Sequence, residues 1–137
     1  MLSITAEIRN QIIQHALQEV PNEACGQFAA EKGTTEVHTF FPMRNVAESS
    51  VIYQLDPHEM MKVEEEADQK NIQIVGVMHS HTHTEAYPSP TDVKDAANFD
   101  PLGSWHYLIV SLEKEEPSIR SFRIKDGEIS EEQVRVT

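Results

Sequence analysis

The chain has 137 residues, of which 39% are hydrophobic and 25% charged, and its formal net charge is −12. A strongly negative protein repels phosphate groups, so the composition argues against nucleic acid and anionic membranes as partners. No apolar run approaches the roughly 20 residues that a membrane span requires. The start MLSITAEIRNQ lacks the features of a signal peptide, and the single cysteine, Cys25, rules out an internal disulfide. We therefore expect one cytoplasmic domain over residues 1–137.

The first part of the chain alternates between helical and strand patterns. Apolar residues at helical spacing predict a helix from Ala6 to Val20, and Pro21 ends it. Strands are predicted over three ranges, which are Ala24–Ala30, Glu36–Met43 and Val51–Leu55. A second helix is predicted from Asp56, which caps it, to about Gln69, with Glu59 reaching back to complete a capping box.

The second part of the chain begins with the apolar run Ile72–Met78, which is typical of a buried strand. A short helix is predicted over Thr91–Phe99. Three closing strands are predicted, over Trp105–Leu112, Ile119–Ile124 and Glu128–Val136. Strands interleaved with two or three helices indicate an α/β or α+β sandwich.

Three histidines occupy alternate positions directly after the buried strand, at His79, His81 and His83. On an extended chain the first two point to one face, roughly 6.5 Å apart, so both can bind one zinc ion at about 2.0–2.1 Å. His83 would lie about 13 Å from His79 unless the chain turned. The other four histidines are expected to be packed or surface residues, namely His15, His38, His58 and His106.

A catalytic zinc site needs a third protein ligand and leaves one position for water. Glu85 stands at the His-x-His-x-x-x-Glu spacing of cupins, but the predicted helices argue against an all-β barrel. Asp92 follows a proline-containing stretch that can turn the chain back towards the histidines. Asp92 also suits a helix start, with Ser89 as N-cap and Pro90 at the first helical position, so this pattern alone leaves both roles open.

Taken together, these residues resemble the signature of the JAMM metalloproteases, also called MPN-plus domains. His79-Ser-His81, ten intervening residues and Asp92, with Ser89 three residues before it, match the family's His-x-His-x(10)-Asp motif. The upstream stretch PNEACG resembles the family's glutamate element, here Glu23. The resemblance covers essentially the whole chain. It implies a three-layer α/β/α sandwich with a mixed sheet, similar to cytidine deaminase.

The resemblance also implies roles for five residues. One zinc ion per chain would be held by His79, His81 and Asp92. Glu23 would hold the attacking water as general base and then protonate the leaving amine. Ser89 would donate a hydrogen bond to the developing oxyanion.

Three further residues are expected outside the metal site. His83 is expected to be solvated or to line the substrate groove. Cys25 is expected to be a buried, inert thiol, because free cysteine packs well in cores. Gly26 is expected to permit a turn or a close backbone approach near Glu23.

Within the family, the chain most resembles small bacterial members that act on ubiquitin-like sulfur-carrier proteins, through the stretches TEAYPSPTDVK and NEACG. This likeness implies hydrolysis after the C-terminal Gly-Gly of a β-grasp carrier, with release of cysteine in cysteine biosynthesis. The carrier's extended tail is expected beside Thr82–Tyr87. Two alternatives stay open, a non-catalytic scaffold of the same fold and a peptidase acting on other ubiquitin-like conjugates.

Overall fold

The computed structural model describes every residue from Met1 to Thr137. The elements in chain order are β1 (Leu2–Ile4), α1 (Ala6–Gln18), β2 (Cys25–Glu31), β3 (Glu36–Met43), α2 (Pro57–Gln69), β4 (Ile72–His81), α3 (Pro90–Phe99), β5 (His106–Ser111), β6 (Ser118–Lys125), β7 (Glu128–Glu132) and β8 (Val134–Val136). The strands form one eight-stranded sheet in the order β7-β6-β5-β4-β2-β3-β1-β8. None of the helices combines the length and apolar character needed to cross a bilayer.

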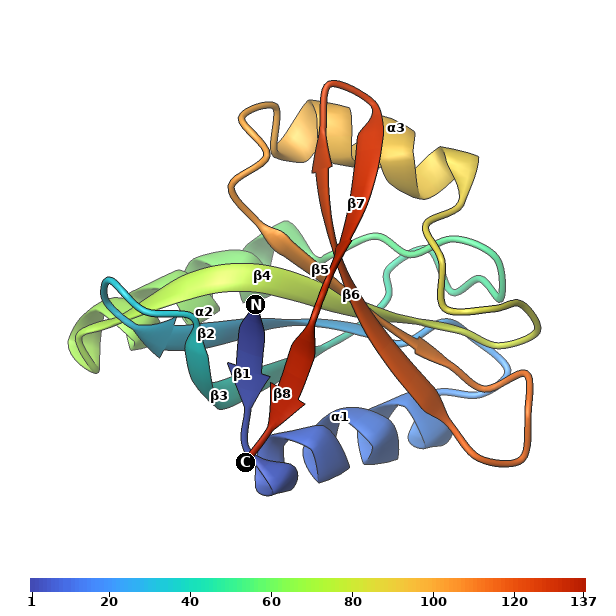
Figure 1. The fold of residues 1–137 in the computed structure, drawn as a ribbon, viewed down its shortest axis with the longest axis horizontal. Helices are drawn as coiled ribbons and strands as arrows, with labels where there is room; N and C mark the ends of the chain where they lie inside the picture. Colours follow the sequence, from blue (N-terminus) through green and yellow to red (C-terminus); the bar gives the residue numbers. More distant parts are fainter.

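The sheet is mixed and lies between helices. Helix α1 covers one face, and α2 and α3 cover the other (Figure 1). Ile12 of α1 packs in one buried cluster with Phe28 and Met78, whereas Ala96 of α3 packs in a second cluster with Val77. Neighbouring residues of β4 therefore point to opposite faces, as the strand period requires. This architecture confirms the predicted α/β/α fold class.

The two outermost strands of the sheet are consecutive in the chain. Strand β7 pairs antiparallel with β6, and β8 pairs parallel with β1. Only Gln133 separates β7 from β8, so the two edges of the sheet lie next to each other at this residue. Its carbonyl accepts a hydrogen bond from the Leu2 N–H at 2.9 Å. The predicted single strand Glu128–Val136 is therefore wrong in its extent. The apolar residues change parity between the halves, since Ile129 packs against the second cluster and Val134 against the first, but this change of phase does not identify β1 as the new partner.

Other boundaries also differ from the prediction. The three-residue strand β1 was too short to give a pattern, and α1 ends at Gln18, two residues earlier than expected. Residues 51–55 form no strand, because their only ladder contact is an isolated bridge between Asn45 and Leu55. Asp56 caps α2 as predicted, but Glu59 does not close a capping box. The Glu59 carboxylate instead accepts the Arg44 N–H at 2.9 Å.

Glycine allows the two neighbouring strands to approach β4 closely at its middle. Gly76 is paired with His106 of β5 and with Phe28 of β2. A Cβ atom at Gly76 would lie 2.2 Å from the His106 carbonyl oxygen and 2.4 Å from Cζ of Phe28. Because one of these atoms belongs to the backbone of a paired strand, the sheet itself would have to shift.

Gly76→Ala is expected to lower the free energy of unfolding by about 1–3 kcal/mol, the usual cost of overpacking a filled core. Urea denaturation followed by circular dichroism measures it. The matched control is Gly33→Asn, since Gly33 has φ +80° with nothing within 4 Å and asparagine tolerates that conformation. Equal losses in the two variants would show that the β4–β5 contact is not tight.

Candidate metal centre

Strand β4 continues past Met78 and ends at His81, so both histidines of the motif belong to a regular strand. His79 and His81 point to the face covered by α3, and their Nε2 atoms lie 3.1 Å apart. Both side chains are buried. Ser80 points to the opposite face, where its hydroxyl oxygen accepts the Ala24 N–H at 2.8 Å.

Asp92 reaches the histidines from the first turn of α3, in the crossover between the parallel strands β4 and β5. Its Oδ2 atom lies 3.1 Å from Nε2 of His79 and 3.1 Å from Nε2 of His81. The same oxygen accepts the Ser89 N–H at 2.9 Å, while Ser89 Oγ accepts the Asp92 N–H at 3.1 Å. Asp92 therefore completes the capping box and faces the histidines at once. The two roles that the local pattern left open are compatible, because a carboxylate oxygen has two lone pairs.

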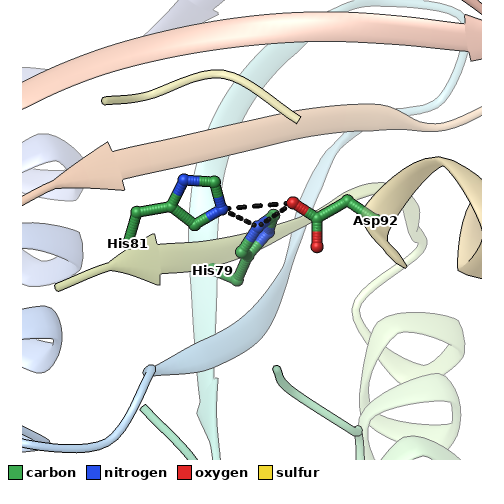
Figure 2. Close-up of side chains that lie close together, drawn as sticks. All are labelled: His79, His81 and Asp92. Carbon is green, nitrogen blue, oxygen red and sulfur yellow. Dashed lines mark hydrogen bonds and ion pairs between the residues drawn. The ribbon is translucent and has the colours of Figure 1, made fainter. Parts of the chain in front are cut away.

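The three atoms form a nearly equilateral triangle with one common centre (Figure 2). Three ligands of a tetrahedral zinc ion at 2.0–2.1 Å would be about 3.3 Å apart, close to the separations seen here. Nδ1 of His81 lies 2.8 Å from the Glu85 carbonyl oxygen, to which a protonated Nδ1 donates. Such a bond leaves the Nε2 lone pair of His81 directed at the centre. The arrangement thus fits a divalent cation held by two imidazoles and one carboxylate.

Electrostatics in the cluster favour an ionised Asp92. Burial acts to raise the pKa of Asp92, but His79, His81 and the Ser89 N–H outweigh it and hold this pKa well below its usual range. Burial likewise acts to lower the pKa of His81, yet its bonds to Asp92 and to the Glu85 carbonyl raise it overall. A carboxylate that stays ionised suits a metal ligand.

Glu23 lies just before β2, in the segment that pairs with the end of β4. Cys25 is in register with His79, and the Ser80 N–H donates to the Ala24 carbonyl at 3.1 Å. The backbone of Glu23 is fixed, since its N–H donates to the Ser49 carbonyl at 2.8 Å and its carbonyl accepts from Nδ2 of Asn45 at 3.0 Å.

The Glu23 side chain is only 3% exposed, and its Oε1 has no hydrogen-bond partner within the protein. Burial raises the pKa of this carboxyl to about 8, with His81 opposing and Asp92 adding to the shift. A buried carboxyl with one uncommitted oxygen is suited to exchange a proton near neutral pH.

The remaining candidates lie outside the metal-binding group. His83 is exposed, and Glu85 contributes its carbonyl rather than its carboxylate, so the cupin-type ligand set is not formed. Cys25 is fully buried as expected, and burial raises the pKa of its thiol to about 12. Gly26 lies within β2 and permits a close approach rather than a turn, since a Cβ would lie 2.5 Å from the Phe41 carbonyl oxygen.

The four isolated histidines lie outside the metal centre. His38 and His58 are exposed. Nε2 of His15 contacts the Cys25 carbonyl at 2.9 Å, and His106 pairs with Glu132.

Sequence reasoning missed three residues around the centre. Ser80 could have been found, because the residue between two ligands on a strand must point to the other face. Asn45 and Tyr53 gave no signal, since they come from an irregular segment. The Tyr53 ring stacks on His79 with centroids 4.3 Å apart, and Tyr53 also lines a cavity of about 240 Å³ bounded by α3.

Comparison with known proteins agrees with this fold and site. A family model of prokaryotic homologs of the JAB domain matches residues 5–125. The chain is 39% identical over 137 residues to the CysO-cysteine peptidase of Mycobacterium tuberculosis. The matched region covers 99% of this chain and 91% of that protein. It is 30% identical over 115 residues to a probable TtuB-protein conjugate cleaving protease of Thermus thermophilus, covering 83% and 70% of the two chains.

Solved structures show the same fold. A protein from Desulfitobacterium hafniense superposes with a TM-score of 0.90 at 31% identity, covering 100% of this chain and 93% of that one. A JAB1/MPN domain protein from Archaeoglobus fulgidus has a TM-score of 0.65 at 15% identity, with 99% and 97% covered. The chain therefore belongs to the JAB family, in which the JAMM metalloproteases are found.

Removal of a ligand should abolish tight metal binding. The variants His81→Ala and Asp92→Asn are expected to weaken zinc binding by more than about a hundredfold, since loss of an outer-sphere partner alone costs 10–100-fold. Competition with a chromophoric chelator measures the affinity, and metal analysis is expected to give one zinc per chain. The matched controls His83→Ala and Glu85→Gln should bind as the wild type does. Weak binding by His83→Ala would mean that His83 is a ligand.

The raised pKa of Glu23 predicts a pH-dependent stability for the metal-free protein. Between the ordinary pKa of 4.5 and the folded value of about 8, the folded chain holds a proton that the unfolded chain has lost. The free energy of unfolding should therefore fall as pH rises through this range, by at most about 1.4 kcal/mol per pH unit.

Urea unfolding of the metal-free protein at pH 5 to 8 tests this, with Glu23→Gln as the comparison. The raised pKa of His81 gives a fall of the same sign, and its larger causes, Asp92 and the Glu85 carbonyl, are present in both proteins. The wild type should show the steeper fall. Identical slopes would mean that the Glu23 carboxyl is ionised in the folded protein.

Proposed function

We propose that the protein is a zinc-dependent peptidase that cleaves the bond after the C-terminal Gly-Gly of a ubiquitin-like sulfur-carrier protein and releases cysteine for cysteine biosynthesis. The relative in M. tuberculosis, a CysO-cysteine peptidase similar along nearly its whole length, supports this substrate. A cytoplasmic location suits the free thiol of Cys25, which would persist in a reducing compartment.

One observation carries the proposal, namely the position of Glu23 beside the His79–His81–Asp92 cluster. The cluster matches a zinc site with two histidines and one carboxylate. The carboxyl of Glu23 is buried, interacts with His81 and Asp92, and is bound to neither of them. A proton carrier beside a metal site, rather than within it, is the arrangement that metal-assisted hydrolysis requires.

His79, His81 and Asp92 would hold the zinc ion. When bound, zinc supplies Lewis acidity and makes water a usable nucleophile at neutral pH. Glu23 takes the proton of the attacking water and returns it to the leaving nitrogen. The Glu23 carboxyl is buried and its Oε1 has no hydrogen-bond partner within the protein, so it is free to accept and then return this proton.

Ser89 would stabilise negative charge on the carbonyl oxygen. Its Oγ accepts the Asp92 N–H, so the hydroxyl hydrogen is free to be donated to substrate. The Ser89 side chain is only half-buried and lies at the start of α3, where backbone N–H groups also favour negative charge. We assign to it the oxyanion-stabilising role.

The carrier's tail is proposed to lie beside the loop Thr82–Tyr87. This loop is held at two points, by the contact of His81 with the Glu85 carbonyl and by a hydrogen bond from Ser111 Oγ to the Thr84 carbonyl at 2.6 Å. A loop fixed in this way offers a rigid wall for an extended peptide. The exposed His83 belongs to the same wall.

A second substrate class is a carrier joined to another protein. The T. thermophilus relative is described as a probable TtuB-protein conjugate cleaving protease, and it is similar over 83% of this chain. The same residues can act on a lysine-linked amide, because the carbonyl carbon under attack is again that of the terminal glycine.

Intact-mass analysis of a Gly-Gly-ending sulfur carrier extended by one cysteine tests the proposal. Wild-type enzyme loaded with zinc is expected to remove one cysteine residue. Glu23→Gln should slow this step by about 10²–10⁴-fold and Ser89→Ala by about 10²–10³-fold, the usual effects of removing a general base and an oxyanion donor.

Zinc affinity serves as the control, since neither variant removes a metal ligand. Both should still bind one zinc ion. Equal cleavage by wild type and Glu23→Gln would contradict the assigned role of Glu23. If the cysteine-extended carrier stayed intact while a lysine-linked conjugate was cleaved, the second substrate class would be the correct one.

A further inference from the structure

The two histidines of the cluster are supported differently. Metal-binding histidines almost always donate their second ring N–H to a carbonyl, a carboxylate or water, which fixes the ring. Nδ1 of His81 has such a partner, the Glu85 carbonyl at 2.8 Å. Nδ1 of His79 is buried and has no hydrogen-bond partner within the protein. No side chain or carbonyl of the protein therefore fixes the His79 ring through Nδ1.

The contact that takes this place is an aromatic stack. The Tyr53 and His79 rings have centroids 4.3 Å apart and an interplanar angle of 18°. The His81 and His79 rings are instead arranged edge to face, with centroids 4.9 Å apart and an interplanar angle of 61°. A stacked ring restricts tilting of the imidazole out of its plane, which is the motion that would carry Nε2 away from the common centre.

Tyr53 lies in an irregular segment, but its backbone is fixed on both sides by one buried side chain. Nδ2 of Asn45 donates to the Ile52 carbonyl at 3.0 Å, and Oδ1 of Asn45 accepts the Gln54 N–H at 3.0 Å. The same Nδ2 donates to the Glu23 carbonyl at 3.0 Å. One amide therefore connects the segment that carries Tyr53 with the backbone of Glu23.

We infer that Tyr53 is a positioning residue for the metal ligand His79, holding the imidazole by stacking where a hydrogen bond to Nδ1 is missing, and that Asn45 holds Tyr53 in place. This inference rests on the metal centre of the proposed function and not on the identity of the carrier. On this inference the irregular segment 45–55 serves to hold the His79 ring in its metal-binding orientation. If Tyr53 were only a core residue, its replacement would change stability but not the relative affinity for metal.

The test is a zinc titration of folded variants, with far-UV circular dichroism to verify the fold. Tyr53→Phe retains the ring and should bind zinc within about twofold of the wild type. Tyr53→Leu removes the ring and should weaken binding by roughly tenfold, as for the loss of an outer-sphere partner. Tyr53→Met provides a second non-aromatic variant if the leucine protein does not fold. The absorption spectrum of the Co²⁺-loaded protein should change in the non-aromatic variants only, because it reports ligand geometry.

Ile52→Ala is the matched control, because Ile52 lines the same cavity as Tyr53 and belongs to the same segment, but it has no ring to stack on His79. It should bind zinc as the wild type does. Tyr53→Leu with wild-type affinity, or Tyr53→Phe as weak as Tyr53→Leu, would overturn the inference. A wild-type protein that binds no zinc would overturn the metal centre itself, and with it the inference. The measurement needs no carrier, so a failure of carrier cleavage leaves it unaffected.

Discussion

The pairing between β2 and the end of β4 is the constraint on which the rest of the site depends. The ladder continues beyond β2 to Ala24, which exchanges backbone and side-chain hydrogen bonds with Ser80. Because side chains alternate along a strand, fixing Ser80 on one face fixes both neighbouring histidines on the other. The same two bonds hold the residue next to Glu23. A shift of one residue in this register would turn the histidines to the wrong face and separate them from the acid.

The crossover from β4 to β5 adds the third member of the cluster by means of ordinary helix capping. The capping box of α3 orients the Asp92 side chain before any metal is involved, since it bonds the Ser89 N–H. A ligand that is already ordered loses little conformational entropy when a metal binds. The oxygen used for capping is also the one that faces the histidines, so local helix stability and metal affinity are coupled through a single atom.

The sequence was sufficient for features encoded in short patterns. Alternation placed His79 and His81 on one face, and the Ser-Pro-x-Asp stretch located the start of α3; the structure shows both. Features set by distant partners were not predictable in this way. The division of the last strand at Gln133 depends on where β1 lies, and the false strand at residues 51–55 depends on Asn45, whose amide bonds the segment from within. Tyr53 was missed for the same reason, because its contact with His79 joins residues far apart in the chain.

The environment of Cys25 has a consequence for redox chemistry. Only a thiolate attacks a disulfide, and the raised pKa of this buried thiol leaves almost none at neutral pH. The protein should therefore not form mixed disulfides with cystine or other small disulfides. This property suits an enzyme whose proposed product is itself a thiol, because accumulated cysteine and its oxidised form would leave the active site unmodified.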